Sequence, residues 1–427
     1  MEKTDARYAA YLKILHEELI PAMGCTEPIA IAYAGAVAKK VLGTMPERVL
    51  VEASDNIIKN VKSVVVPNTG GQKGIAAAAV AGIVAGDAER ILEVISDVSI
   101  DGRAQIADYL KSNEVKVVSL QSGIIFDLVV TVYSGSDSAS VQLSHYHTNI
   151  VRITKNGETE IYNQHCNDIT PSQILNRSFM NVEDILKFAA SVELSEVKDV
   201  LDKQIEYNVA IAKEGLKGNW GANIGSVLLQ SWGTDDIKVR AKAMAAAASD
   251  ARMSGCELPV MIVSGSGNQG LTASLPVIEF ARELKVDEET LYRGLIISNL
   301  VTIHQKTRIG RLSAYCGAIS AGVGAGAGIT WLHGGRFDEV AHTIVNALAI
   351  VSGIICDGAK PSCAGKIASA VEAGLLGHYM YKNGQQFYGG DGIIKKGVEN
   401  TIANVGRLGS KGMLETDKEI IRMMLGE

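Results

Sequence analysis

The spacing of apolar and polar positions divides the chain into two N-terminal helices, a strand-rich part and a long helical part. Residues 5–19 have the period of an amphipathic helix, with apolar side chains at Tyr8, Leu12, Leu15 and Leu19. Pro21 cannot continue a helix, so this element is predicted to end before it.

A short turn, MGCTEP, follows at residues 23–28. Thr26 has the side chain of a helix N-cap and Pro28 fits a first helical turn, so a second helix is predicted to begin here. Cys25 would then stand just outside the positive end of this helix. Such a position lowers the pKa of a thiol, so we expect it to favour the thiolate form of Cys25.

Strand-like segments occupy much of residues 46–155. RVLVEAS and VKSVVVP, both within 46–67, are rich in β-branched residues, and four more such segments separated by Ser, Gly and Asp turns lie between 114 and 155. Between these two groups, Asn68-Thr69-Gly70-Gly71 leads into a helix of small residues at 74–86. This succession predicts a mainly antiparallel sheet.

From about residue 180 the pattern is helical, with segments at 181–191, 194–214, 236–253, 270–284 and 287–305. The fold class expected is therefore α+β: an α+β domain at residues 46–165, and a larger all-α domain, rich in glycine and alanine, at 166–427. We expect the helices of residues 1–45 to pack on the all-α domain, because MGCTEP would then reach cysteines near the C-terminus.

Composition limits the classes of partner. The chain has 427 residues, enough for two or three domains, and a formal net charge of −6 that leaves no basic footprint for nucleic acid. Residues 312–335 lack Asp, Glu, Lys and Arg, yet their glycines suit a loop or a tightly packed helix better than a bilayer. With no signal peptide evident, we expect a cytoplasmic protein that binds no membrane and has reduced cysteines; a homo-oligomer stays open.

Three cysteines stand at the edges of apolar, glycine-rich segments: Cys316 in SAYCGAIS, Cys356 in GIICDGAK and Cys363 in KPSCAGKI. Three grouped thiolates without a fourth would hold an iron-sulfur cluster and leave one iron open to substrate. Cysteine is also among the most buried residue types, so three small core residues are the alternative.

Two polar loops precede predicted helices. The backbone amides of Asn68, Thr69, Gly70 and Gly71 could cradle a substrate carboxylate, or form an ordinary helix-entry turn. Ser264-Gly265-Ser266-Gly267-Asn268-Gln269-Gly270 offers hydroxyls and amides at another helix entry, and we expect Ser264, Ser266, Asn268 and Gln269 to contact substrate.

The remaining acid-base and thiol groups have less context. His145 and His147, two apart on a predicted strand, would face the same side, but a zinc site would need further ligands. His304, near the end of a predicted helix, is a candidate for substrate contact, with helix-end dipole pairing as the alternative. Cys166 and Cys256 are assigned to structure.

Five motifs in order along the chain, MGCTEP, VPNTGGQKGI, SGSGNQG, YCGAISAGVGAGAG and ICDGAKPSCAGK, resemble the L-cysteine desulfidase family, relatives of the iron-sulfur L-serine dehydratases. Cys316, Cys356-Asp357 and Cys363 after Pro361 are similar to the cysteine pattern of the dehydratase α chain. The last two cysteines stand closer together here than in the dehydratases, and their serine- and histidine-rich substrate motif is missing from the N-terminal half. Both departures favour the desulfidase branch.

The resemblance implies β-elimination of L-cysteine to sulfide, ammonia and pyruvate, with a four-iron four-sulfur (4Fe-4S) cluster on Cys316, Cys356 and Cys363 as Lewis acid. It also implies that Cys25 is the catalytic base or a reversible fourth ligand, and Glu27 is expected to assist in proton transfer. Three alternatives stay open: an L-serine dehydratase with the same cluster, a pyridoxal-phosphate lyase, and a non-enzymatic amino-acid binding protein.

Overall fold

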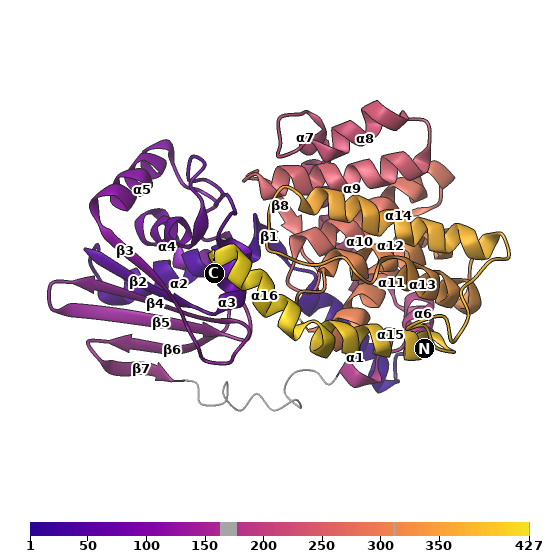
Figure 1. The fold of residues 1–427 in the computed structure, drawn as a ribbon, viewed down its shortest axis with the longest axis horizontal. Helices are drawn as coiled ribbons and strands as arrows, with labels where there is room; N and C mark the ends of the chain where they lie inside the picture. Colours follow the sequence, from indigo (N-terminus) through magenta and orange to yellow (C-terminus); the bar gives the residue numbers. More distant parts are fainter. Residues whose placement is uncertain (163–176, 311–312, 427) are drawn as a thin grey trace.

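The computed structural model describes residues 1–162, 177–310 and 313–426. Two large hydrophobic cores organise them, one beneath a β-sheet and the other within a bundle of helices. Figure 1 shows the sheet and its helices on the left and the helical domain on the right, which matches the expected α+β class.

The sheet has six strands in the order β3-β2-β4-β5-β6-β7. They are β2 (Arg48–Ala53), β3 (Glu114–Ser119), β4 (Asp127–Ser134), β5 (Asp137–Ser144), β6 (Ile150–Lys155) and β7 (Glu158–Tyr162). Neighbours pair antiparallel, as predicted, except that β2 and β3 pair in parallel. A parallel neighbour requires a crossover, and helices occupy the chain between these two strands.

That crossover contains α3 (Asp55–Val61), α4 (Gly74–Ala85), the short helix η1 (Ala88–Glu93) and α5 (Ile100–Ser112). The strand predicted for VKSVVVP is therefore wrong: its first residue closes α3, and only an isolated bridge between Val65 and Lys73 follows. A run of valines has strand composition, but this one lies in a buried loop between two helices.

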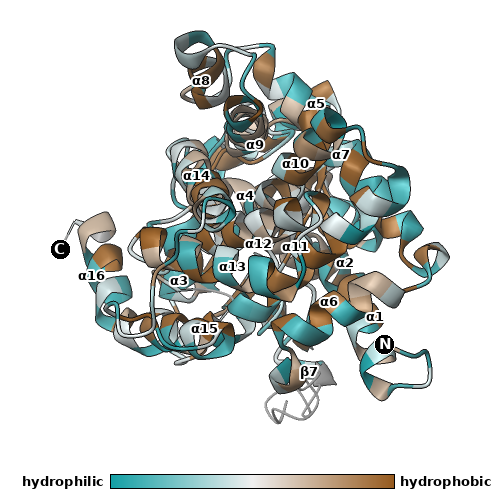
Figure 2. Ribbon diagram, turned by 90° about the vertical axis from the view of Figure 1, so that its right-hand side faces the viewer, coloured by the Kyte–Doolittle hydropathy of each residue, from teal (hydrophilic) through white to brown (hydrophobic). Residues whose placement is uncertain are grey.

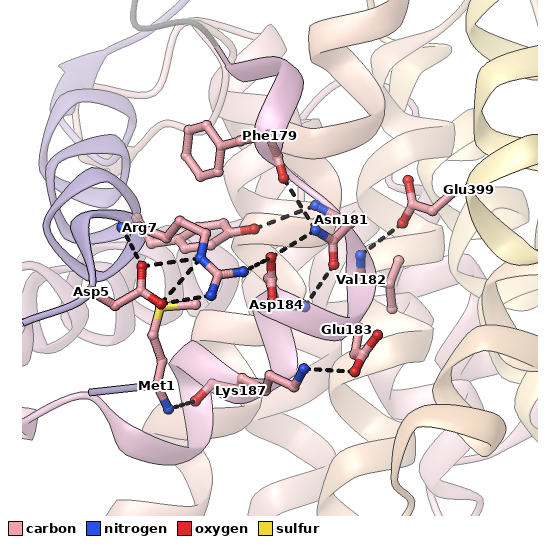
Figure 3. A network of polar contacts seen from close by, with 11 residues as sticks. Met1, Asp5, Arg7, Phe179, Asn181, Val182, Glu183, Asp184, Lys187 and Glu399 are labelled. Carbon is pink, nitrogen blue, oxygen red and sulfur yellow. Dashed lines mark hydrogen bonds and ion pairs between the residues drawn. The ribbon is translucent and has the colours of Figure 1, made fainter. Parts of the chain in front are cut away.

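The first two helices pack on different domains. α1 (Ala6–Glu18) packs in the helical domain, where Tyr8 and Tyr11 are buried and Arg7 bridges Asp5 to Asp184. Figure 3 shows this network joining α1 to α6. In contrast, α2 (Thr26–Leu42) packs against β4, β5 and α4, so the expectation that both helices lie on the all-α domain is wrong for the second.

Small residues explain where α2 lies. A Cβ atom on Gly82 of α4 would lie 1.8 Å from the carbonyl oxygen of Ala32, and one on Gly35 would lie 2.7 Å from that of Ala79. The two helices therefore cross at a distance that larger residues would prevent. The alanine-rich faces of α2 and α4 become part of the core beneath the sheet.

The helical domain contains every helix predicted from residue 181 onward. Its elements are α6 (Val182–Ser191), α7 (Lys198–Leu216), α8 (Ile224–Trp232), α9 (Ile237–Met253), α10 (Gly267–Leu284), α11 (Glu288–Ile309), α12 (Gly317–Leu332), α13 (Phe337–Val351), α14 (Cys363–Lys382), α15 (Val398–Arg407) and α16 (Leu414–Leu425), with short helices η3 (Arg177–Phe179), η4 (Leu194–Glu196) and η5 (Leu408–Gly412). Figure 2 looks onto this domain, with α11 and α12 at its centre.

The central helix, α12, is the glycine-rich stretch of the sequence. A Cβ on Gly322 would lie 2.3 Å from the carbonyl of Ala370 in α14, and one on Gly324 would lie 2.3 Å from Thr302 Oγ1 in α11. Glycine thus lets α12 touch both neighbours, and its N-terminus with Cys316 is fixed in the core. Of the helices in the described ranges, none combines the length and apolar character needed to cross a bilayer.

Several contacts join the two domains. β1 (Pro21–Met23) pairs antiparallel with β8 (Pro259–Met261), and Lys59 of α3 forms a buried ion pair with Asp417 of α16. Arg103 of α5 reaches Glu257 at 2.6 Å. In Figure 1, α16 extends from the helical domain toward α3. The domain junction is therefore held at several points.

Candidate active site

A buried cavity lies where the two domains meet. From the sheet side it is lined by the start of α2, the end of α3 and the loop after β5; from the helical side by the entries of α10, α12 and α14. Its volume is about 110 Å³, far above the ~10–15 Å³ that a single buried water needs. It brings together Cys25, Glu27, Ser264, Ser266, Asn268, Gln269, Cys316, Cys356 and Cys363.

Cys25 and Glu27 form the sheet-side wall. We expected Thr26 to be the N-cap of α2, but the N-cap is Cys25 and Thr26 is the first residue of the helix. Cys25 Sγ donates a hydrogen bond to Glu27 Oε2 at 3.2 Å, and Asn60 Nδ2 donates to Glu27 Oε1 at 3.0 Å. Thr26 Oγ1 donates to the carbonyl oxygen of Gly265 at 2.9 Å, which ties this wall to the loop before α10.

The proton of this pair resides on sulfur. Burial raises the pKa of Cys25 well above its ordinary value, and the neighbouring Glu27 carboxylate raises it further. Burial also acts to raise the pKa of Glu27, but nearby His147, the Cys25 hydrogen bond and Arg252 outweigh it and lower the pKa. The expectation that the helix end makes Cys25 a thiolate is therefore wrong for this state, because desolvation and a carboxylate oppose the helix dipole.

The three other cysteines line the helical side. Cys316 is the N-cap of α12, and Cys363 is the first residue of α14. Cys356 lies in the loop between α13 and α14, held beside Cys316 by backbone bonds: the Cys356 N–H donates to Ala314 and the Cys316 N–H donates to Ile354. Cys25, Cys316 and Cys363 thus all stand at helix N-termini, whose partial positive charge favours anions.

The donor set fits an iron-sulfur cluster. All three cysteines are free thiols, and burial together with the nearby Cys356 raises the pKa of Cys316 to about 12. Deprotonating them together therefore calls for cations, and thiolates are the usual ligands of clustered iron. Within the described residues, no three His, Cys, Asp or Glu side chains converge tightly enough for a single metal ion.

Two lysines fix the loop that carries Cys356. Lys360 Nζ donates to the carbonyl oxygens of Asp357 and Gly358 at 3.0 and 3.2 Å, and Lys366 Nζ donates to that of Ile355 at 2.9 Å. Both lysines also pair with the Asp357 carboxylate. They place positive charge beside the three thiols, which would offset the negative charge of bound thiolates.

The loop before α10 forms the third wall. Ser264 adopts a left-handed backbone conformation, with φ of 51°, and its buried Oγ has no hydrogen-bond partner in the described chain. Gln269 is also buried, its Oε1 lacks a partner there, and its side chain packs on Gly317 beside Cys316. Such unsatisfied groups in a cavity are typical of a ligand site.

The turn that was predicted to hold the substrate carboxylate lies away from the cavity. In the Asn68–Gly71 turn, Asn68 Nδ2 donates to the carbonyl of Ile95 and Thr69 Oγ1 donates to that of Val66. Neither they nor Gly70 and Gly71 line the cavity; the preceding Pro67 instead packs on Gly24, before Cys25. This segment therefore shapes the backbone of the site rather than its surface.

His304 also fails to reach the cavity. Its Nε2 lies 2.8 Å from Glu399 Oε2, and Glu399 accepts a hydrogen bond from the Val182 N–H, shown in Figure 3. This pairing joins α11, α15 and α6 inside the helical domain. The structure therefore does not bring His304 to the cavity, because it lies on a face of α11 that packs against other helices.

The remaining histidines and thiols also have places in the fold. His145 and His147 follow the end of β5, and His147 lines the cavity while His145 lines a neighbouring one, so the shared strand face was wrong. Cys256 is buried in the helical core, as assigned. Cys166 lies outside the described residues.

Among the polar residues of the cavity that sequence reasoning missed are Lys59, Asn60, Arg252 and Lys306. Lys59 and Asn60 belong to the segment expected to precede a strand, and Arg252 and Lys306 stand near the C-terminal ends of helices α9 and α11. Charged residues there commonly serve helix stability, so nothing in their local pattern marked them.

Residues 103–422 match the family model described as serine dehydratase alpha chain. The chain belongs to this family. It is 61% identical over 427 residues to the UPF0597 protein of Desulfitobacterium hafniense, covering 100% of this chain and 99% of the relative. It is also 51% identical over 422 residues to that of Lachnoclostridium phytofermentans (98% and 100% covered) and 46% identical over 429 residues to that of Treponema denticola (100% of both). The expected relationship to the serine dehydratase alpha chain is confirmed, and the desulfidase branch stays a proposal.

Proposed function

We propose that this protein is a lyase that eliminates sulfide from L-cysteine, using a 4Fe-4S cluster held by Cys316, Cys356 and Cys363. One observation carries the proposal: a single buried cavity has these three thiols on one side and the Cys25–Glu27 pair on the other. When bound, the cluster would supply a Lewis acid to the leaving sulfur through an iron that no protein thiolate holds.

The chain's own residues account for the proton transfers. Elimination takes the α-proton and the β-thiol from L-cysteine, which leaves aminoacrylate and hydrogen sulfide; water then converts aminoacrylate to pyruvate and ammonia. Cys25 can pass its proton to Glu27 Oε2, to which it already donates a hydrogen bond. The ammonium group of an entering amino acid would favour this transfer by stabilising the thiolate, and the thiolate would then accept the α-proton.

The cavity walls favour a small substrate. Cys25 approaches from the start of α2, and Ser264 and Gln269 approach from the loop before α10 and its first turn. The volume suits an amino acid with a short side chain better than a peptide or nucleotide. The low exposure of lining residues such as Cys25 and Gln269 strengthens electrostatic contacts with the reacting groups. The polar Ser264 Oγ and Gln269 Oε1 atoms, both without partners in the described chain, would hydrogen-bond the amino acid.

L-Serine is the second candidate substrate, favoured by the family to which the chain belongs. The same proton transfers would release water from serine instead of sulfide from cysteine. A thiol leaves more readily than a hydroxyl and binds iron more tightly, which favours cysteine.

The test is an anaerobic assay of protein reconstituted with iron and sulfide and then desalted. L-Cysteine, D-cysteine and L-serine are compared by pyruvate release, and the two cysteines also by sulfide release. We expect equal amounts of sulfide and pyruvate from L-cysteine, and a brown protein that air bleaches. Pyruvate from L-serine alone would favour the dehydratase, and a yellow protein whose absorbance shifts on borohydride treatment would point to pyridoxal phosphate. Cys256→Ser, outside the cavity, is the matched control and should retain activity.

A further inference from the structure

Arg252 is a buried cation in the cavity. It stands in the last turn of α9, its residue is 2% exposed, and it lines the cavity beside Ser266 and Asn268. Its one hydrogen bond to a side chain in the described chain runs from Nη1 to Asn268 Oδ1 at 3.1 Å. The buried Nε has no partner, and no carboxylate of the described residues lies within ion-pair distance of Arg252.

A guanidinium in such a place needs an anion. Removing a charged group from water is costly unless a counter-charge and hydrogen bonds replace its hydration. Other buried cations of this protein have such partners: Lys59 pairs with Asp417, and Arg177 pairs with Glu18 at 2.6 Å. Arg252 instead has a neutral amide at Nη1, and its buried Nε has no partner in the described chain.

The surroundings of Arg252 add to the positive charge. Gly267, the first residue of α10, lies so close that a Cβ atom there would stand 2.3 Å from Arg252 Nε. The guanidinium is therefore pressed against the positive end of a helix. Glu27 is the nearby carboxylate whose pKa Arg252 helps to lower, but its oxygens accept from Cys25, Thr26 and Asn60. The cavity thus keeps a cationic corner with free donors.

We infer that Arg252 binds the α-carboxylate of the amino-acid substrate. A carboxylate matches the planar fork of a guanidinium, and in this corner it would gain guanidinium N–H donors together with the end of α10. This inference rests on the proposed amino-acid chemistry and deepens it. It moves the carboxylate from the Asn68–Gly71 turn to Arg252, with Asn268 as the positioning residue that orients the guanidinium.

The orientation has a consequence for selectivity. An amino acid held by its carboxylate at Arg252 has its α-carbon fixed between the Cys25–Glu27 wall and the wall of the three other cysteines. Only one enantiomer can then direct its α-proton toward Cys25 and its β-group toward the cysteines. Compounds without a free carboxylate, such as amino-acid amides, would lose this anchor and bind weakly.

The experiment measures binding rather than turnover, with anaerobically reconstituted protein and isothermal titration calorimetry. The probes are L-alanine, which has no leaving group, and L-alaninamide, which lacks only the carboxylate. Wild type should prefer L-alanine, and Arg252→Gln should lower that preference about 10- to 100-fold, the scale of hydrogen bonds to a charged group. Arg252→Lys keeps a positive charge, and Asn268→Ala keeps the guanidinium but removes its hydrogen-bond partner. Each should lower the preference for L-alanine by a smaller factor. Arg240→Gln, on the exposed face of α9, should leave it unchanged.

Two results would overturn the inference. One is equal affinity of wild type for L-alanine and L-alaninamide, which needs no variant to fold. The other is a full wild-type preference in Arg252→Gln, or in both Arg252→Lys and Asn268→Ala if the glutamine variant does not fold. If the protein releases sulfide but its preference for L-alanine does not depend on Arg252, this inference is wrong and the proposed elimination stands. If the preference for L-alanine depends on Arg252 but no sulfide is released, the proposed elimination is wrong and the carboxylate site stands.

Discussion

Cys25 Sγ donates its hydrogen bond to Glu27 Oε2 at 3.2 Å, within the cavity that Cys316, Cys356 and Cys363 line from the other side. A thiol that gives its proton to a carboxylate two residues ahead can become a base without an external proton acceptor. The same thiol, once deprotonated, could also ligate iron. Experiments can distinguish these two roles of Cys25, as a base and as an iron ligand.

Replacing Cys25 by alanine should remove the base and spare the cluster. Anaerobically reconstituted Cys25→Ala is expected to keep the iron content and brown colour of the wild type, while its rate of L-cysteine elimination falls by ~10²-fold or more. Iron analysis and sulfide assays on the same sample check this. Loss of iron in the variant would contradict the base assignment and make Cys25 a structural ligand.

Gly358 should be required for the loop that carries Cys356. It has a φ of +90°, and a Cβ atom there would lie 2.4 Å from the carbonyl oxygen of Lys59. Gly358→Ala is expected to lower the free energy of unfolding by about 1–3 kcal/mol and to reduce iron binding. Gly365→Ala, in α14 with open space around it, should be neutral or slightly stabilising in the same denaturant titrations.

The ion pair between Lys59 and Asp417 should stabilise the domain junction. The Lys59 side chain is 1% exposed, so Asp417→Asn would leave a buried ammonium without its counter-charge. We expect the free energy of unfolding to fall by about 2–4 kcal/mol, and Lys59→Met in that background to restore part of it. On the same helix, Glu415→Gln breaks an exposed pair and should change the free energy of unfolding little. Equal effects of Asp417→Asn and Glu415→Gln would contradict this account.

A buried histidine pair should make stability fall in acid. Burial lowers the pKa of His378 to about 4, and its ring lies 4.7 Å from that of His333. Between about pH 6.5 and 4 the unfolded chain binds a proton at this residue and the folded protein does not, so stability is lost as pH falls. His378→Gln should therefore lose less stability than wild type from pH 6.5 to 4.5 in urea titrations. An unchanged pH slope would contradict the buried, neutral state of His378.

Much of the fold could be predicted because local pattern and packing agree. Helices such as α6 and α10 have clear apolar periodicity, and the strands of residues 114–155 are separated by turn residues. The VKSVVVP segment failed because its valines fill a buried loop. The prediction assigned α2 to the wrong domain because its alanine-rich sequence fits either core. Only the close crossing with α4 at Gly35 and Gly82 determines where it packs.

The candidate site was predictable where chemistry concentrates in short motifs. Cys25, the Ser264–Gln269 loop, Cys316 and Cys363 stand near glycine at helix entries, and Cys356 lies in the loop before α14; the structure brings them to one cavity. Arg252 could not be found in this way, because its role depends on burial and on the lack of a carboxylate beside it. His304 was overvalued because its partner Glu399 lies 95 residues away.

The most direct test of the cluster site is the iron content of anaerobically reconstituted protein, measured together with that of its single cysteine variants. The account predicts about four irons per chain in the wild type and in Cys256→Ser, because Cys256 lies in the helical core away from the cavity. It predicts that Cys316→Ser, Cys356→Ser and Cys363→Ser each lose the cluster. Full iron binding by Cys363→Ser would contradict the three-thiolate site, and with it the central claim that this cavity works through a cluster.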